Sequence, residues 1–168
     1  MSQTQRTIRI GDREVTRMGL GTNRLRHTPE HVRFIRDAVA AGIGMIDTAH
    51  LYSGGESERS VGEALRDAAA DVVVATKGGY RPGEGSREVI RSQIEQSLRS
   101  LQRDRIDLYY LHRVDPETPL EQTLEAIAEQ REAGRIAQVG ISAVGVSEIE
   151  RAQQVVPIAA VQNHYNVC

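Results

Sequence analysis

The chain lacks most of the features that mark secreted or membrane-bound proteins. It has a single cysteine, Cys168 at the last position, so no disulfide can form within the chain, which fits a reducing compartment. Residues 1–9 are polar and lack the apolar core of a secretion signal, and no run approaches the ~20 apolar residues of a membrane-spanning helix. We therefore expect a cytoplasmic protein with no membrane partner.

The chain also lacks a clear excess of either positive or negative charge. The chain has 21 Lys and Arg against 23 Asp and Glu, for a formal net charge of -2. The most arginine-rich stretch, residues 99–105, is interrupted by Asp104 and followed by Asp107, so no basic stripe offers a surface to phosphates. We do not expect nucleic acid as a partner. With 168 residues, 39% of them hydrophobic, the chain is long enough for one domain with a buried core, residues 1–168.

Short apolar runs alternate with helical patterns along the chain. Residues 7–15 predict a hairpin that turns at Gly11 and Asp12. The strands predicted after it are residues 18–21, 45–47, 72–76, 106–111, 136–141 and 155–161. The predicted helices run from Thr28 to Gly42, from Ser57 through Val61, Ala64, Leu65 and Ala68, from Ser86 to Leu101, from Pro119 to Ala133 and from Ser147 to Gln154. Such apolar strands between amphipathic helices predict a parallel sheet covered by helices.

The glycine pattern after the first strand argues against one class of parallel sheet. Dinucleotide-binding open sheets have a Gly-x-Gly-x-x-Gly turn at this point. Residues 19–23 contain two glycines in the matching register and no third. The strand and helix pattern alone leaves a closed barrel and an open sheet as alternatives, and the missing turn disfavours the dinucleotide-binding form of the open sheet.

Four polar side chains follow the predicted strands. Asp47, Lys77 and His112 each end a short apolar run, and Tyr52 lies five residues after Asp47 in a glycine-rich loop. Singly, each has an ordinary explanation, such as a turn cap, a surface lysine or a loop aromatic. Parallel strands place their carboxyl ends at one edge of the sheet, where βα folds carry their chemistry. Together, the four residues therefore predict a functional site.

Five segments, in order, closely resemble the signature motifs of the aldo-keto reductase family. They are residues 44–58, 75–77, 107–112, 134–142 and 161–166. The resemblance covers essentially the whole chain and implies a (β/α)8 barrel that binds NADP(H) without a dinucleotide-binding open sheet. A complete barrel of this kind has ~250 residues, whereas the pattern gives six strands. We therefore expect an α/β fold, a parallel TIM barrel truncated after strand six with an N-terminal β-hairpin, and self-association through its open edge.

The resemblance also assigns roles to residues. The catalytic positions it implies are Asp47, Tyr52, Lys77 and His112. The cofactor contacts it implies are Gly21, Thr22, Asp47, Ser142 and Gln162. Ala143 stands where the family usually has a polar partner, so one amide contact is left open. No metal is expected, because His27 and His31 are four residues apart with no carboxylate to complete a ligand set.

The four strand-end residues suit the reduction of a carbonyl group. This reaction needs a hydride on carbon, which a nicotinamide cofactor supplies, and a proton on oxygen. Tyr52 can give the proton, and a nearby Lys77 cation would lower the pKa of the phenol from ~10. Asp47 can hold Lys77, and His112 can donate a hydrogen bond to the substrate oxygen.

Two other interpretations stay open at this stage. Lys77 at a barrel strand end could instead form a Schiff base with a carbonyl substrate, as in an aldolase, although Asp47 would keep it charged. A truncated barrel could also be an inactive or regulatory member of the family. The sequence does not give the carbonyl substrate or the choice between NADPH and NADH.

Overall fold

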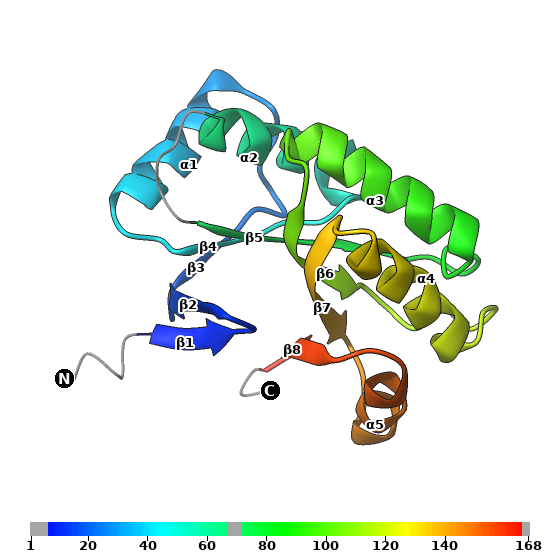
Figure 1. Cartoon of the computed structure of the whole chain (residues 1–168). Helices are drawn as coiled ribbons and strands as arrows, with labels where there is room; N and C mark the ends of the chain where they lie inside the picture. Colours follow the sequence, from blue (N-terminus) through cyan, green and yellow to red (C-terminus); the bar gives the residue numbers. More distant parts are fainter. Residues whose placement is uncertain (1–6, 67–71, 166–168) are drawn as a thin grey trace.

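A computed structural model describes residues 7–66 and 72–165 of the chain. Ala68, Asn166 and Cys168, which belong to predictions made above, lie outside these ranges. Within them, every helix falls short of the length and apolarity that a membrane crossing requires. A hairpin at the start of the chain is followed by one six-stranded sheet and its helices (Figure 1).

The sheet is parallel throughout, and its strands lie side by side in chain order. The hairpin strands are β1 (Thr7–Ile10) and β2 (Arg13–Thr16). The sheet strands are β3 (Gly19–Gly21), β4 (Met45–Asp47), β5 (Val73–Gly78), β6 (Ile106–Leu111), β7 (Ile136–Ser142) and β8 (Ile158–Gln162). The helices are α1 (Pro29–Ala40), the short 3-10 helix η2 (Tyr52–Gly55), α2 (Glu56–Leu65), α3 (Arg87–Leu101), α4 (Leu120–Glu132) and α5 (Val146–Val155).

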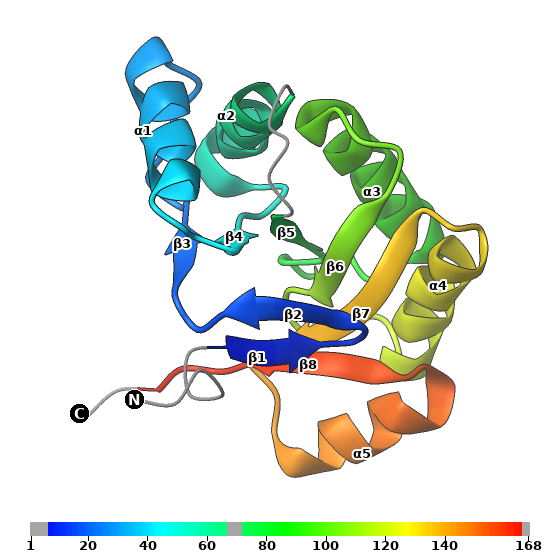
Figure 2. The same cartoon turned by 60° about the vertical axis from the view of Figure 1, so that its left-hand side comes forward.

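The sheet curls, and its helices follow one another around its outer side (Figure 2). This is the arrangement of a partial parallel barrel, and it confirms the predicted fold class, including the N-terminal hairpin. The largest boundary error is at the last strand: Val155 was expected in it but ends α5, and β8 begins at Ile158. Pro157 explains the gap, because a residue before proline is disfavoured in a helix and Val156 is extended, with φ -149 and ψ 144.

Two apolar clusters hold the sheet in place. The larger lies between the sheet and the helices and includes Ile90, Ile94 and Leu101 of α3, which are almost fully buried. Burying each such side chain stabilises the fold by about 1.5–3 kcal/mol. The smaller cluster joins Ile10 and Val15 of the hairpin to inward-facing residues of β5 and β6. The hairpin therefore packs on the inner side of the sheet.

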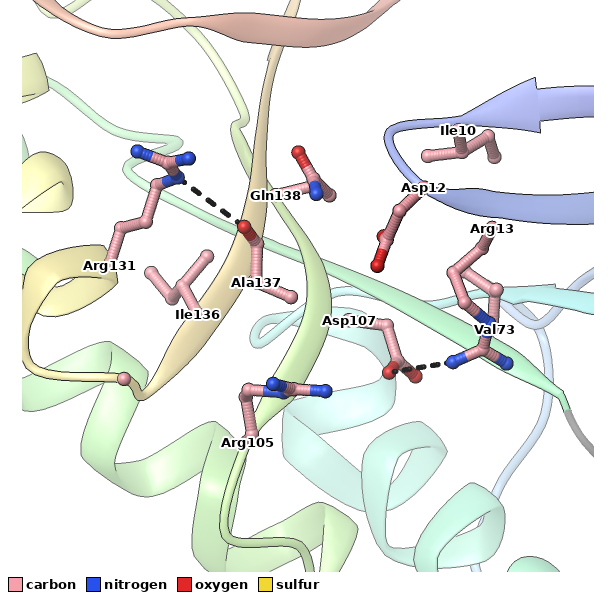
Figure 3. A pocket seen from close by; sticks show the side chains of 11 residues that line it. Ile10, Asp12, Arg13, Val73, Arg105, Asp107, Arg131, Ile136, Ala137 and Gln138 are labelled. Carbon is pink, nitrogen blue, oxygen red and sulfur yellow. Dashed lines mark hydrogen bonds and ion pairs between the residues drawn. The ribbon is translucent and has the colours of Figure 1, made fainter.

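Charged and polar contacts fix the hairpin to the starts of the strands (Figure 3). Arg13 lies 3.8 Å from Asp107 of β6, and the same carboxylate accepts a 2.9 Å hydrogen bond from the backbone N–H of Val74. The hairpin turn uses Gly11 at φ +59, where a Cβ would come within 2.4 Å of the Gln138 side chain. Between these elements lies the hairpin pocket, about 420 Å³, at the amino-terminal ends of the strands.

A close packing contact at the end of β5 gives a stability prediction. A Cβ on Gly78 would lie 2.1 Å from Tyr109 Oη and 2.5 Å from Gln93 Oε1, so Gly78→Ala must displace buried groups. We expect a loss of about 2 kcal/mol in the free energy of unfolding, measured by urea denaturation, in the range typical of overpacking. Gly21→Ala, where a Cβ meets nothing within 4 Å, is the control. Equal losses in the two variants would contradict the packing account.

Candidate active site

The carboxyl ends of the strands bring the predicted site residues to one edge of the sheet. Gly21 is the register partner of Asp47, and Ser142 is the partner of Gln162. His112 directly follows β6, and its N–H donates to the carbonyl of Gly78 at 2.8 Å. The parallel pairing thus aligns residues that are far apart in the sequence.

Lys77 lies at the centre of this edge. Its side chain is only 1% exposed, inside a strand whose residues are all buried. Its Nζ donates to Asp47 Oδ1 at 2.5 Å, to the backbone carbonyl of Thr48 at 2.8 Å and to Tyr52 Oη at 3.4 Å. An ammonium has three N–H bonds, so these three acceptors satisfy it completely. Burial lowers the pKa of Lys77, and the Asp47 carboxylate opposes that shift.

Tyr52 opens the short helix η2, in a loop with unusual backbone geometry. Ser53 and Gly54, which follow it, have φ values of 49 and 64, a region that favours glycine. This turn directs the Tyr52 hydroxyl toward Lys77. The pKa of Tyr52 is raised, first by burial and then by the negative charge of Asp47. The expected net lowering of this pKa by Lys77 was wrong for the isolated chain, because burial of the phenol and the nearby Asp47 carboxylate raise it.

His112 faces the Tyr52 ring edge-on, with ring centroids 6.0 Å apart and an interplanar angle of 81°. Its Nδ1 is buried without a hydrogen-bond partner among the described residues, which leaves Nε2 as the nitrogen for a substrate. Burial, followed by the positive charge of Lys77, lowers the pKa of His112 to about 4. The imidazole is therefore neutral near pH 7, and a neutral ring with its hydrogen on Nε2 can donate one hydrogen bond.

The lowered pKa of His112 predicts a specific pH dependence. In the unfolded chain the imidazole titrates near 6.5, and in the folded protein near 4. Its contribution to stability is therefore complete above pH 6.5 and is lost as the pH falls toward 4, because the unfolded chain binds the proton first. We expect an NMR titration midpoint near 4 and a weaker acid-induced loss of stability in His112→Gln. A midpoint near 6.5 would contradict the burial of this ring.

A cavity of about 620 Å³, the strand-end cavity, opens beside these residues. Its lining residues are Tyr52, His112, Arg113, Ser142, Ala143, Val144, Gln162, Asn163 and His164. Two of the expected cofactor contacts, Ser142 and Gln162, therefore share a cavity with Tyr52 and His112. Gln162 Nε2 also donates to Asp47 Oδ2 at 2.9 Å, which leaves its side-chain oxygen as an acceptor. Ala143 has φ +56, a conformation strained for a residue with a Cβ.

The other expected cofactor contacts lie on the far side of Asp47. Thr22 is fully buried, and its hydroxyl donates to the backbone carbonyl of Asp47 at 3.0 Å. The same hydroxyl accepts from Ser57 Oγ at 2.7 Å. The Thr22 side chain thus anchors Asp47. Gly21 is exposed at the end of β3, and a cofactor contact at either residue stays a prediction.

Several residues of the site were not anticipated from the sequence. The backbone carbonyl of Thr48 completes the shell around Lys77. Tyr80 packs on His112 with ring centroids 4.8 Å apart, and the guanidinium of Arg113 lies 5.0 Å from the Tyr80 ring centroid. Arg113 directly follows the predicted histidine, but nothing in the apolar periodicity indicates that it would face the cavity.

The two N-terminal histidines have other partners. His27 Nε2 lies 2.7 Å from Glu63 Oε2, and His31 Nδ1 accepts from the backbone N–H of Arg26 at 2.9 Å. Residues 7–66 and 72–165 contain no group of three or more His, Cys, Asp or Glu side chains arranged to hold a metal ion.

Comparison with known proteins connects this geometry to one family. The model of the Aldo/keto reductase family matches residues 17–168. Aldo-keto reductase YhdN of Bacillus subtilis is 34% identical over 171 residues, covering 92% of this chain and 51% of its own length. The chain spans about half the length of the curated relatives it matches.

Solved structures show the same arrangement of strands and helices. The thermostable aldo-keto reductase Tm1743, solved in complex with the inhibitor epalrestat, superimposes with a TM-score of 0.87 at 32% identity, covering 95% of this chain and 62% of its own. The aldo/keto reductase of Klebsiella pneumoniae, solved in complex with NADP and acetate, gives a TM-score of 0.78 at 30% identity, covering 89% and 53%. The six-stranded curled sheet therefore matches the greater part of a known parallel barrel.

Proposed function

The chain belongs to the aldo/keto reductase family, and on this basis we propose that it reduces an aldehyde or ketone to an alcohol with NADP(H) as cofactor. One observation carries the proposal: Lys77 Nζ reaches both Asp47 and Tyr52 Oη in a buried contact beside an open cavity. A phenol, an ammonium and an imidazole at one cavity suit proton delivery to a carbonyl oxygen. We propose that residues 1–168 form one domain and that this domain carries the reaction.

The residues at the cavity fit a nicotinamide. Its carboxamide has both a donor and an acceptor, and the Ser142 hydroxyl and the side-chain oxygen of Gln162 offer complementary groups. Solved structures in complex with NADP and NADPH support a nicotinamide cofactor in this family. When bound, the cofactor supplies the hydride, and the protein supplies placement and charge.

Tyr52 delivers the proton. Its raised pKa keeps the phenol protonated at neutral pH, so the donor is loaded before the substrate arrives. As the carbonyl oxygen gains negative charge, the proton moves to it from Tyr52 Oη. The Lys77 ammonium, 3.4 Å away, stabilises the phenolate that is left.

His112 orients the substrate. Because its ring is neutral, it can donate one hydrogen bond to the carbonyl oxygen without competing with Tyr52 as an acid. The close packing of Tyr80 against the ring restricts its rotation. Preorganised donors of this kind stabilise charge that develops in the transition state.

An assay of NADPH consumption tests the proposal. The purified protein is mixed with NADPH and a panel of aldehydes, and parallel samples are treated with borohydride and analysed by mass spectrometry. Aldehyde-dependent NADPH oxidation supports the reductase. A substrate adduct on Lys77 supports an aldolase instead, although an amine that donates to three acceptors is poorly placed to attack a carbonyl.

Two further assignments stay predictions. Self-association is proposed through the outer strands β3 and β8, whose outer edges carry no further strand in the described part of the chain. A sizing column tests it, and an inactive or regulatory role is indicated if oligomers form and NADPH does not bind. A cytoplasmic location also stays a prediction.

A further inference from the structure

The strand-end cavity has an uneven charge distribution. Arg113 is the one permanently charged side chain among the described residues that line it. Beneath the cavity, Lys77 and Asp47 carry opposite charges 2.5 Å apart and cancel. The surface that a substrate meets therefore has a net positive charge, and that charge comes from Arg113.

Arg113 is held at this position by its surroundings. Its backbone N–H donates to the carbonyl of Gly79 at 3.0 Å, which ties it to the loop after β5. Its guanidinium lies 5.0 Å from the centroid of the Tyr80 ring, and that ring in turn packs on His112 at 4.8 Å. A cation over an aromatic face keeps its N–H donors free for another partner.

Two neighbouring polar side chains, Glu84 and Asn163, are engaged by other groups and do not neutralise Arg113. No described carboxylate forms an ion pair with it. The carboxylate of Glu84, in the same loop as Tyr80, accepts from the backbone N–H groups of Tyr80 and Arg81 and pairs with the Arg81 guanidinium at 3.7 Å. The Asn163 side chain both donates to and accepts from the backbone of Val144.

We propose that the cavity selects carbonyl compounds that also carry a carboxylate group, and that Arg113 binds this group. The inference rests on the proposed carbonyl reduction, whose substrate class it specifies. A guanidinium presents paired N–H donors that match the two oxygens of a carboxylate. The substrate's carbonyl then lies against Tyr52 and His112 while its carboxylate lies over the Tyr80 side of the cavity.

A matched pair of aldehydes tests this inference. The carboxylate substrate is 4-formylbenzoate, and methyl 4-formylbenzoate has the same reacting group without the charge. We expect the unmodified protein to show a kcat/KM about tenfold higher for the carboxylate, the size of a charge-assisted hydrogen bond. Arg113→Met should abolish this ratio, and Arg113→Lys should retain much of it, because lysine keeps the charge.

Arg105→Met is the control, since Arg105 is an arginine of the hairpin pocket at the opposite end of the strands (Figure 3). It should leave the ratio unchanged. An unchanged ratio in Arg113→Met, or a preference of the unmodified protein for the ester, would overturn the inference while leaving carbonyl reduction intact.

A binding measurement separates this inference from the proposed function. If neither aldehyde is reduced, the proposed function fails, and calorimetric titration with 4-formylbenzoate then decides the inference. Binding that is lost in Arg113→Met and kept in Arg105→Met supports a carboxylate site. Absence of binding, or binding that is indifferent to Arg113, rejects it.

Discussion

Replacing Tyr52 by Phe is expected to lower kcat for aldehyde reduction by about 10³-fold, within the range that general acid catalysis contributes. The change removes only the hydroxyl that lies 3.4 Å from Lys77 Nζ and keeps the ring that faces His112. NADPH affinity, measured by fluorescence quenching, should change by no more than about twofold, because Tyr52 acts on the substrate oxygen. The comparison of kcat with affinity therefore isolates proton delivery from cofactor binding.

Tyr109→Phe is the matched control for this experiment. Tyr109 is fully buried in the helix-facing cluster, and its hydroxyl has no hydrogen-bond partner among the described residues. Loss of that hydroxyl should leave both kcat and NADPH affinity near those of the unmodified protein. Near-normal turnover in Tyr52→Phe would contradict its role as the acid, and another donor at the cavity would then have to supply the proton.

The second large effect concerns the buried ion pair. Asp47→Asn leaves the Lys77 ammonium, 1% exposed, without its counter-charge. Breaking a buried pair by removing one partner costs about 3–5 kcal/mol, and because Asp47 is 20% exposed we expect about 2–3 kcal/mol. Aldehyde reduction should fall together with stability, since Lys77 is no longer held beside Tyr52.

A double-mutant cycle separates the charge effect from ordinary loss of contacts. Lys77→Met removes the buried charge and fills much of its volume. If the unpaired ammonium causes the loss, the variant carrying both Asp47→Asn and Lys77→Met unfolds at a higher urea concentration than Asp47→Asn alone. Simple addition of the two single losses would show that the pair is not coupled.

The sequence was sufficient to predict where in the fold the candidate site lies. Asp47, Lys77 and His112 each follow an apolar run, and parallel pairing necessarily brings such strand ends to one edge. The structure places all three there, in the expected order across the sheet. The later start of β8, at Ile158, could also have been predicted, because Pro157 precedes it in the sequence. The error at Val155 arose because the predicted strand was extended through this proline.

Other features depend on three-dimensional facts that a linear pattern does not contain. The contact of Gln162 with Asp47 requires the curl that brings β8 toward β4. The direction of the Tyr52 pKa shift depends on how deeply the phenol is buried and on how close the Asp47 carboxylate lies to it. The face on which Arg113 lies depends on the loop carrying Tyr80, whose irregular backbone has no periodicity to interpret.

Transfer of deuterium from labelled NADPH to the alcohol shows directly whether the protein reduces a carbonyl group with Tyr52 as the acid. The purified protein is incubated with NADPH deuterated at the transferable position and with 4-formylbenzoate, and the alcohol is analysed by mass spectrometry. We expect one deuterium on the alcohol carbon for each NADPH consumed, and near-complete loss of this product in Tyr52→Phe. Formation of no labelled alcohol, with the aldehyde trapped by borohydride on Lys77, would contradict this expectation.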